Sequence, residues 1–305
     1  MTRVDVKIPS AGEVLAGWFY EADTAPGEEQ RPLIVMAHGL GAIKEMYLPP
    51  VAQKFFEAGF AVLVFDFRCY GGSTGEPREQ AFPAEQLEDF RNAISFGVRR
   101  PGVNPDCVGV WGTSGSGGLV LEVAAYDPRV KAVVSQTPLI DFYEAALRAV
   151  GPEGVSGFLA VLQADRDRRY EDPTPAYIPF AAPTGEAAFQ SNSLTHEWVS
   201  HAQQTVAPSF QNRITMESIE RLLEWAPGSA ASRIAPAALM FVVATRDGTT
   251  HPDLIEAAFE RAADPKEIVR VESNHYEIYT GAAQAEATEH ATRWFIEQLA
   301  RPASA

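Results

Sequence analysis

The sequence predicts an α/β protein with a mostly parallel, doubly wound sheet of eight strands and a mainly helical insertion. Short apolar runs, typical of strands covered on both faces, alternate with amphipathic helical patterns in the first half of the chain and again near its end. Between these parts, about a hundred residues show no clear strand pattern. A compact domain rarely contains so long a loop, so the sequence predicts a core domain of residues 1–137 and 235–305 and a helical cap of residues 138–234.

Composition narrows the classes of protein that this chain can belong to. Its 305 residues, 46% of them hydrophobic, suffice for one large domain with an insertion. The net charge of −15 argues against binding to nucleic acid or to an anionic membrane surface. The N-terminus lacks an apolar signal core and no apolar run approaches membrane-spanning length, so we expect a cytoplasmic protein. The sequence leaves a homodimer open.

Cysteine and histidine spacing gives no sign of a cofactor. Cys69 and Cys107 are the two cysteines, which is too few for a disulfide framework, and no Cys/His pattern suggests zinc. His196 and His201 are five residues apart, a poor spacing for two ligands on one helix face. We therefore expect neither a metal nor a cofactor.

The core elements follow in order from local patterns. Residues 3–9 and 14–22 alternate apolar and polar side chains and predict a strand hairpin, followed by a polar loop at 24–31. Continuous apolar runs predict buried strands at 33–37, 60–65, 107–111, 130–135, 237–244 and 266–271. Helical patterns lie between them at 50–58, 85–99, 115–126, 252–263 and 280–300, and residues 216–225 look helical within the cap.

A strand, a sharp turn and a helix follow one another between Val108 and Gly118, with Ser114 at the turn. A chain that reverses so tightly needs small neighbours, which explains the glycines around this serine. The turn would expose the Ser114 hydroxyl above the sheet and place the amide of Gly115 at a helix N-terminus, where it can donate to an oxyanion.

Several motifs in this order resemble those of the α/β-hydrolase superfamily. The turn is similar to its nucleophile elbow, Gly-x-Ser-x-Gly, except that Ser116 takes the last position. The other matching motifs end predicted strands or follow them: His38-Gly39, Asp66-x-Arg68, Asp247 and His275.

Two further motifs make the chain look like the dienelactone-hydrolase and X-prolyl-peptidase-like branch, whose neighbourhood includes polyketide acyltransferases. They are Lys44-Glu45-Met46-Tyr47 and Gly72-Ser73-x-Gly75-Glu76-Pro77-Arg78. Cys69 stands where this branch usually has glycine, so this loop is expected to differ in shape.

The resemblance implies a catalytic triad of Ser114 as nucleophile, His275 as general base and Asp247 as the acid that orients it. His251 and His290 are the rival bases. Pro252 should hold His251 in an extended backbone, and Asp247 is poorly placed to serve a residue four positions along its own loop. The weaker rivals for the acid are Asp141 and Asp253.

The amides of Leu40 and Gly115 would form the oxyanion hole, while His38 would hold the first of these two loops by hydrogen bonds. Aromatic side chains are candidates for binding substrate, although they could equally pack against one another. These candidates are Tyr47, Trp111, Tyr177 and Trp198, with Phe180 and Phe189 beside them in the cap.

The resulting interpretation is a serine hydrolase that cleaves an ester or thioester of a small-molecule acyl substrate through an acyl-enzyme. Two alternatives stay open: an acyltransferase or cyclase that passes the acyl group to another nucleophile, and a noncatalytic binding protein on the same fold. Peptidase activity is disfavoured, because prolyl peptidases that the chain resembles generally carry an additional domain, for which 305 residues leave no room.

Overall fold

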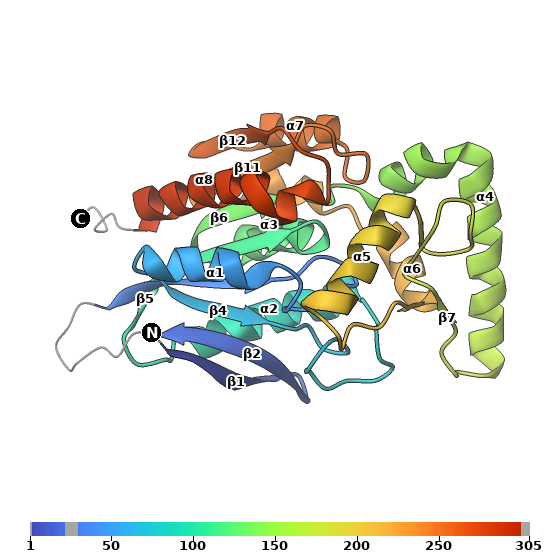
Figure 1. Ribbon diagram of the computed structural model, residues 1–305, viewed down its shortest axis with the longest axis horizontal. Helices are drawn as coiled ribbons and strands as arrows, with labels where there is room; N and C mark the ends of the chain where they lie inside the picture. Colours follow the sequence, from blue (N-terminus) through green and yellow to red (C-terminus); the bar gives the residue numbers. More distant parts are fainter. Residues whose placement is uncertain (1, 22–29, 300–305) are drawn as a thin grey trace.

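The computed structural model describes residues 2–21 and 30–299, and its centre is one sheet in the order β1-β2-β4-β3-β5-β6-β11-β12 (Figure 1). The hairpin of β1 and β2 runs antiparallel, as does its junction with β4, and every other neighbouring pair is parallel. The predicted mostly parallel, eight-stranded sheet is therefore confirmed. Its strands are β1 (Thr2–Ser10), β2 (Glu13–Glu21), β3 (Arg31–Ala37), β4 (Ala61–Phe65), β5 (Val103–Thr113), β6 (Val130–Gln136), β11 (Ala238–Ala244) and β12 (Lys266–Val271).

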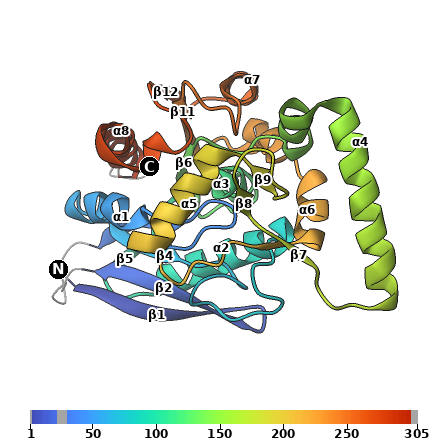
Figure 2. The same ribbon diagram turned by 45° about the vertical axis from the view of Figure 1, so that its right-hand side comes forward.

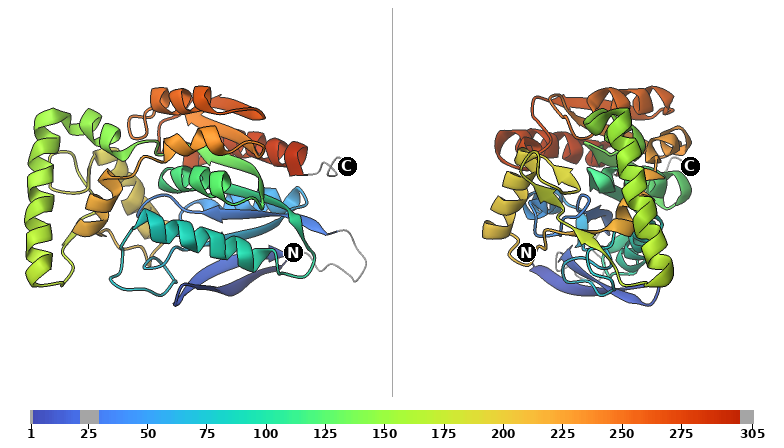
Figure 3. Two further views of the ribbon diagram at one scale, coloured as in Figure 1. Left: turned by 180° about the vertical axis from the view of Figure 1, so that it is seen from behind. Right: turned by 90° about the vertical axis from the view of Figure 1, so that its right-hand side faces the viewer.

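Helices cover both faces of the sheet (Figures 1 and 3). One face carries α1 (Leu48–Glu57) and α8 (Gly281–Leu299), and the other carries α2 (Pro83–Gly97), α3 (Gly115–Tyr126) and α7 (Pro252–Arg261). Successive strand residues point to opposite faces, so Ile34 packs with the first group and Val35 with the second. Because helices bury both faces, the central strands appear in the sequence as unbroken apolar runs.

Most of the residues between β6 and β11 lie beyond the carboxyl ends of the parallel strands (Figure 2), whereas the last of them, Pro227–Arg233, pack against α3 and α7. This segment contains the long α4 (Phe142–Glu171), α5 (Ser193–Thr205), α6 (Met216–Leu223) and a 3-10 turn, η1 (Pro227–Arg233). It also contains four strands of two residues each, too short to produce a sequence pattern: β7 (Tyr177–Ile178), β8 (Ala181–Ala182), β9 (Gln190–Ser191) and β10 (Ile214–Thr215).

Helix α4 has the length and the apolar composition of a membrane-spanning helix, contrary to the expectation that no segment does. The helix is not continuous, however. At Gly151 the backbone has φ 72° and ψ 173°, and Pro152 follows, so α4 consists of two helices joined at a kink.

Polar contacts tie the base of this segment to the loop between β4 and α2. The Arg213 guanidinium lies 2.8 Å from the Glu79 carboxylate, and the hydroxyl of Tyr177 donates to the Arg78 carbonyl over 3.0 Å. Residues 22–29 and 300–305 are outside the described part, and with them most of the predicted loop at 24–31 and the last residue of two predicted elements, Ala22 and Ala300.

Candidate active site

Ser114 lies at the turn between β5 and α3, with φ 55° and ψ −118°. This conformation is costly for a residue with a side chain and is held by its surroundings. Gly112 lets the turn close, because a Cβ atom there would lie 2.2 Å from the carbonyl oxygen of Ser116. Ser116 itself accepts from the Thr113 amide over 2.9 Å and donates to the Ala37 carbonyl over 2.9 Å. The hydroxyl that replaces the usual glycine thus joins the turn to the end of β3.

The structure brings Ser114, His275 and Asp247 into one line. Ser114 Oγ lies 3.1 Å from His275 Nε2, and His275 Nδ1 lies 2.6 Å from Asp247 Oδ2. A carboxylate can only accept, so the imidazole Nδ1 donates to it and Nε2 is left to accept from the serine hydroxyl. Residues 161 positions apart in the sequence therefore form a chain through which a proton can leave Ser114.

Asp247 is buried but well supplied with hydrogen-bond donors. Its Oδ1 accepts from the amides of Thr249 (2.7 Å) and Thr250 (3.0 Å), and its Oδ2 accepts from the Thr250 hydroxyl (2.8 Å). Burial raises the pKa of Asp247, but the charge and hydrogen bond of His275 and the two amides outweigh burial and lower the pKa to about 2. The side chain is a carboxylate at neutral pH.

This lowered pKa makes a prediction about stability. Asp247→Asn is expected to lower the free energy of unfolding at pH 7 by about 2 kcal/mol, because the carboxylate is more acidic in the folded chain than in the unfolded one. The stabilisation is complete above pH about 4 and is lost as the pH falls toward 2. Urea unfolding of both proteins at pH 7, 4 and 3 measures this. An equal difference at pH 7 and pH 3 would contradict a charge-based origin.

The rival residues make other contacts. Asp253 pairs with Arg148 at 2.8 Å, and Asp141 caps α4 by accepting from the Glu144 amide over 3.0 Å. His290 lies half-buried in α8. His251 precedes α7 with φ 57° and ψ 102°, so the prediction of an extended backbone before Pro252 is wrong. The turn that places Thr249 and Thr250 on the Asp247 carboxylate sets the His251 backbone instead.

The amides of Leu40 and Gly115 lie next to each other beside Ser114. A Cβ atom on Gly115 would be 2.9 Å from the Leu40 nitrogen, which shows how closely the two loops approach. Gly115 begins α3, so its amide has no acceptor within the helix. Both residues line the same cavity as Ser114. The arrangement offers two donors where a tetrahedral oxyanion on that serine would form.

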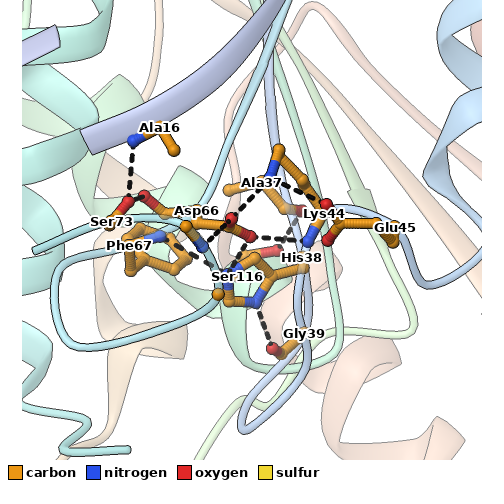
Figure 4. A network of polar contacts seen from close by, with 12 residues as sticks. Ala16, Ala37, His38, Gly39, Lys44, Glu45, Asp66, Phe67, Ser73 and Ser116 are labelled. Atoms are coloured by element: carbon orange, nitrogen blue, oxygen red, sulfur yellow. Dashed lines mark hydrogen bonds and ion pairs between the residues drawn. The ribbon is translucent and has the colours of Figure 1, made fainter. Parts of the chain in front are cut away.

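His38 is fully buried behind this loop. Its Nδ1 lies 2.9 Å from the Gly39 carbonyl and its Nε2 lies 3.4 Å from the Phe67 amide (Figure 4). The two contacts require Nδ1 to donate and Nε2 to accept, so the ring is neutral. Burial lowers the pKa of His38, although nearby Asp66 opposes the shift, which agrees with a neutral ring. Through the Gly39 carbonyl and the Phe67 amide, His38 holds the loop after β3 in place.

A cavity of about 670 Å³ opens over Ser114 and His275. Its walls come from the loop after β3, from α4 and from the segment 180–198, and Phe142 stacks on Phe189 at 5.6 Å. Among the described residues that line it, none is Asp, Glu, Lys or Arg. In the described part of the chain no three His, Cys, Asp or Glu side chains gather closely enough to hold a metal ion. The cavity therefore suits a neutral, largely apolar molecule.

Of the four aromatic residues predicted to bind substrate, Trp198 lines this cavity and the others do not. Trp111 is 1% exposed and packs under α1 and α8, because side chains alternate along β5 and this one points to the far face. The Tyr177 hydroxyl donates to the Arg78 carbonyl, away from the cavity. Tyr47 packs against Trp198 and does not line the cavity itself; the centroids of the two rings are 5.4 Å apart. Phe180 and Phe189 do line the cavity.

Two tyrosines of the site were not predicted from the sequence. Tyr276 directly precedes the turn η2 (Glu277–Tyr279), and Tyr279 ends it. The Tyr276 ring packs against His275 at 5.1 Å, and its hydroxyl lies 2.5 Å from the Thr195 hydroxyl of α5. Tyr279 shares a hydrogen bond of 2.8 Å with Thr113, next to the serine. Their closeness in sequence to His275 was the available signal.

Cys69 adopts φ 67°, the left-handed conformation that glycine takes easily. The thiol is buried, and burial raises the pKa of Cys69 to about 12, so it is an unreactive packing group at neutral pH.

Comparison with known proteins identifies the family. Residues 21–277 match the family described as X-Pro dipeptidyl-peptidase (S15 family). The chain is 30% identical over 281 residues to thiohydrolase aneE of Aspergillus aculeatus, covering 90% of this chain and 88% of the relative. It is 34% identical over 305 residues to a polyketide transferase of Aspergillus fumigatus, covering 98% and 99%.

Among solved structures, the α/β hydrolase GrgF from Penicillium superimposes with a TM-score of 0.84 at 26% identity, over 99% of this chain and all of the other. The fold and the matched length together settle the family. The chain belongs to the X-Pro dipeptidyl-peptidase (S15) family of the α/β-hydrolase superfamily and is a hydrolase-type enzyme.

Proposed function

We propose that this enzyme hydrolyses esters or thioesters of apolar acyl groups through a covalent intermediate on Ser114. The observation that carries the proposal is the line of Ser114, His275 and Asp247 beside a 670 Å³ cavity whose described lining residues include no Asp, Glu, Lys or Arg. A serine hydroxyl needs a base at hydrogen-bond distance to act as a nucleophile, and a base needs a group that fixes its tautomer.

In this mechanism His275 Nε2 takes the hydroxyl proton as Ser114 Oγ attacks the acyl carbon. The carbonyl electrons move to oxygen, which accepts hydrogen bonds from the amides of Leu40 and Gly115. The intermediate collapses, and the leaving alcohol or thiol takes the proton from His275. Water then attacks the acyl-enzyme with His275 as base, and collapse of the second intermediate releases the acid and restores the serine.

The residues that line the cavity favour an apolar acyl group over a dipeptide as the bound part of the substrate. A dipeptidyl peptidase must bind the free ammonium group at the substrate's N-terminus, and a buried ammonium needs a carboxylate partner. None of the described residues lining this cavity is Asp or Glu. The name of the family therefore does not fix the reaction of this member.

The test is a comparison of substrates on the purified protein. We expect turnover of p-nitrophenyl octanoate and of an octanoyl thioester, with octanoic acid as product, and no release of p-nitroaniline from glycyl-proline p-nitroanilide. Faster cleavage of the peptide substrate would contradict the proposal. Failure of Ser114 to react with a fluorophosphonate would favour the noncatalytic alternative.

Acyl transfer is the second candidate, and the relative named as a polyketide transferase favours it. It needs the same acyl-enzyme but a nucleophile other than water in the second step. Product analysis with increasing amounts of an added alcohol separates the two reactions. An ester product that exceeds the acid at low alcohol concentration would establish transfer.

The aromatic wall gives a further prediction. Phe189→Ala is expected to raise KM for p-nitrophenyl octanoate about tenfold. The octanoyl chain would lose apolar contact with the removed ring equivalent to about two methylene groups. KM for the acetate ester should change less than twofold. Phe259→Ala, also half-buried but in α7 away from the cavity, is the matched control. Equal effects on both esters would contradict an acyl-binding role.

A further inference from the structure

A buried ion pair lies directly behind the loop that carries the Leu40 amide. Asp66, at the end of β4, is 0% exposed, and its Oδ2 lies 2.8 Å from Lys44 Nζ (Figure 4). The Lys44 side chain is 8% exposed and passes over the Trp18 ring at 4.8 Å. Lys44 Nζ also lies 2.8 Å from Glu45. Lysine side chains normally extend to solvent. Because the Lys44 side chain is buried instead, its partners must hold it inward.

The Asp66 carboxylate also binds main-chain amides. Its Oδ1 accepts from the Lys44 amide over 2.7 Å, and its Oδ2 accepts from the Gly72 amide over 3.0 Å. One carboxylate therefore fixes the backbone at residue 44 in addition to the ammonium group. The backbone of Asp66 is held in turn, because its amide donates to the Ala16 carbonyl of β2 over 2.9 Å.

The segment 38–44 is thus held at both ends by the neighbouring residues Asp66 and Phe67. At its far end Lys44 binds Asp66, and at its near end the Phe67 amide donates to His38 Nε2 over 3.4 Å. Ser116 adds a bond from the nucleophile turn to the carbonyl of Ala37, just before the segment. Leu40 lies between the two anchors.

A buried ion pair is a poor way to gain stability, because apolar residues of similar volume often serve as well. It is an effective way to hold a backbone in one place, since a carboxylate with three donors has few alternative arrangements. We infer that Lys44 and Asp66 are positioning residues that keep the Leu40 amide aligned for the oxyanion. Neither touches the reacting atoms. The inference rests on the proposed acyl-enzyme mechanism.

Lys44→Met is the test, assayed with p-nitrophenyl octanoate. One oxyanion donor is typically worth a factor of about 10²–10³ in kcat, so a misaligned donor is expected to cost about 10–10². KM should stay within twofold, because the cavity walls are unchanged. The inhibition constant of octylboronic acid, whose tetrahedral adduct puts an oxygen in the hole, should rise by the same factor as kcat falls. Lys44→Arg should recover most of the activity.

Arg68→Met is the matched control. Arg68 is 11% exposed and pairs at 2.7 Å with Asp89, which is 0% exposed, but that pair binds Ser10 of β1 and not the loop. This variant should be less stable and keep its kcat. The inference is overturned if folded Lys44→Met keeps kcat within threefold, or if Arg68→Met loses as much. Should Lys44→Met not fold because it leaves the Asp66 carboxylate unpaired, the double variant Lys44→Met/Asp66→Asn is judged by the same criteria.

The two hypotheses fail differently. If wild type neither cleaves the ester nor reacts with a fluorophosphonate, the proposed function is wrong. If wild type is active and Lys44→Met equally so, only the positioning role is wrong.

Discussion

Ser114→Ala is expected to abolish turnover of p-nitrophenyl octanoate, with a fall in kcat on the order of 10⁶. The reason is that Ser114 Oγ is the hydroxyl that lies 3.1 Å from His275 Nε2, where a base can remove its proton. Loss of one half-buried oxygen should leave the fold intact, because the backbone of the turn is held by Ser116 and by the close approach at Gly112. Initial rates, thermal unfolding and fluorophosphonate labelling measure these three effects.

Ser191→Ala is the matched control for this prediction. Ser191 also lines the cavity, but its hydroxyl accepts from the Gly185 amide in an exposed turn and is far from the line of His275 and Asp247 in the sequence. This variant should keep its activity and its labelling. If Ser114→Ala retained more than about a tenth of wild-type activity, Ser114 would not be the nucleophile.

His275→Ala is expected to slow acylation by several orders of magnitude, whereas His251→Ala should keep most of the wild-type rate. His275 joins Ser114 to Asp247 through its two ring nitrogens, at 3.1 Å and 2.6 Å. Removing it leaves the serine proton without an acceptor and Asp247 without its partner. His251 instead caps the start of α7 through its backbone position. Burst kinetics with p-nitrophenyl octanoate separate acylation from deacylation for both variants.

Asp247 stays ionised down to pH about 2, so its charge is present at every pH at which the two variants are assayed. A normal burst in His275→Ala together with an inactive His251→Ala would show that the histidines had been assigned the wrong way round.

Local patterns in the sequence were enough to predict the sheet. Continuous apolar runs such as 33–37 and 238–244 arise because these strands are covered on both faces, and that requirement is visible residue by residue. The neighbourhood of Ser114, Asp247 and His275 could be predicted for a related reason. Each follows a strand of a parallel sheet, and the carboxyl ends of such strands meet at one edge.

The cavity could not be predicted in the same way. Whether an aromatic residue faces the cavity depends on contacts between segments that are far apart, and these leave no periodic trace. Trp111 lies three positions before Ser114 yet packs on the face of the sheet away from the cavity, while Phe142 and Phe189 meet although 47 positions separate them in the sequence. Proximity in sequence to Ser114 was therefore a poor guide to which aromatic residues of the chain face the cavity.

The sequence by itself determined which core strands and helices follow one another along the chain and which residues end those strands, because both depend on local burial and turn chemistry. Only the tertiary structure decided what surrounds them: the uncharged cavity, the contact of Tyr276 with Thr195 and the pairing of Lys44 with Asp66. The two contacts join groups on different elements, and in the sequence each of the four partners looks like an ordinary polar residue. The cavity likewise has walls from several elements. Such contacts form only when the packed core fixes the distance between their elements to within the length of a hydrogen bond.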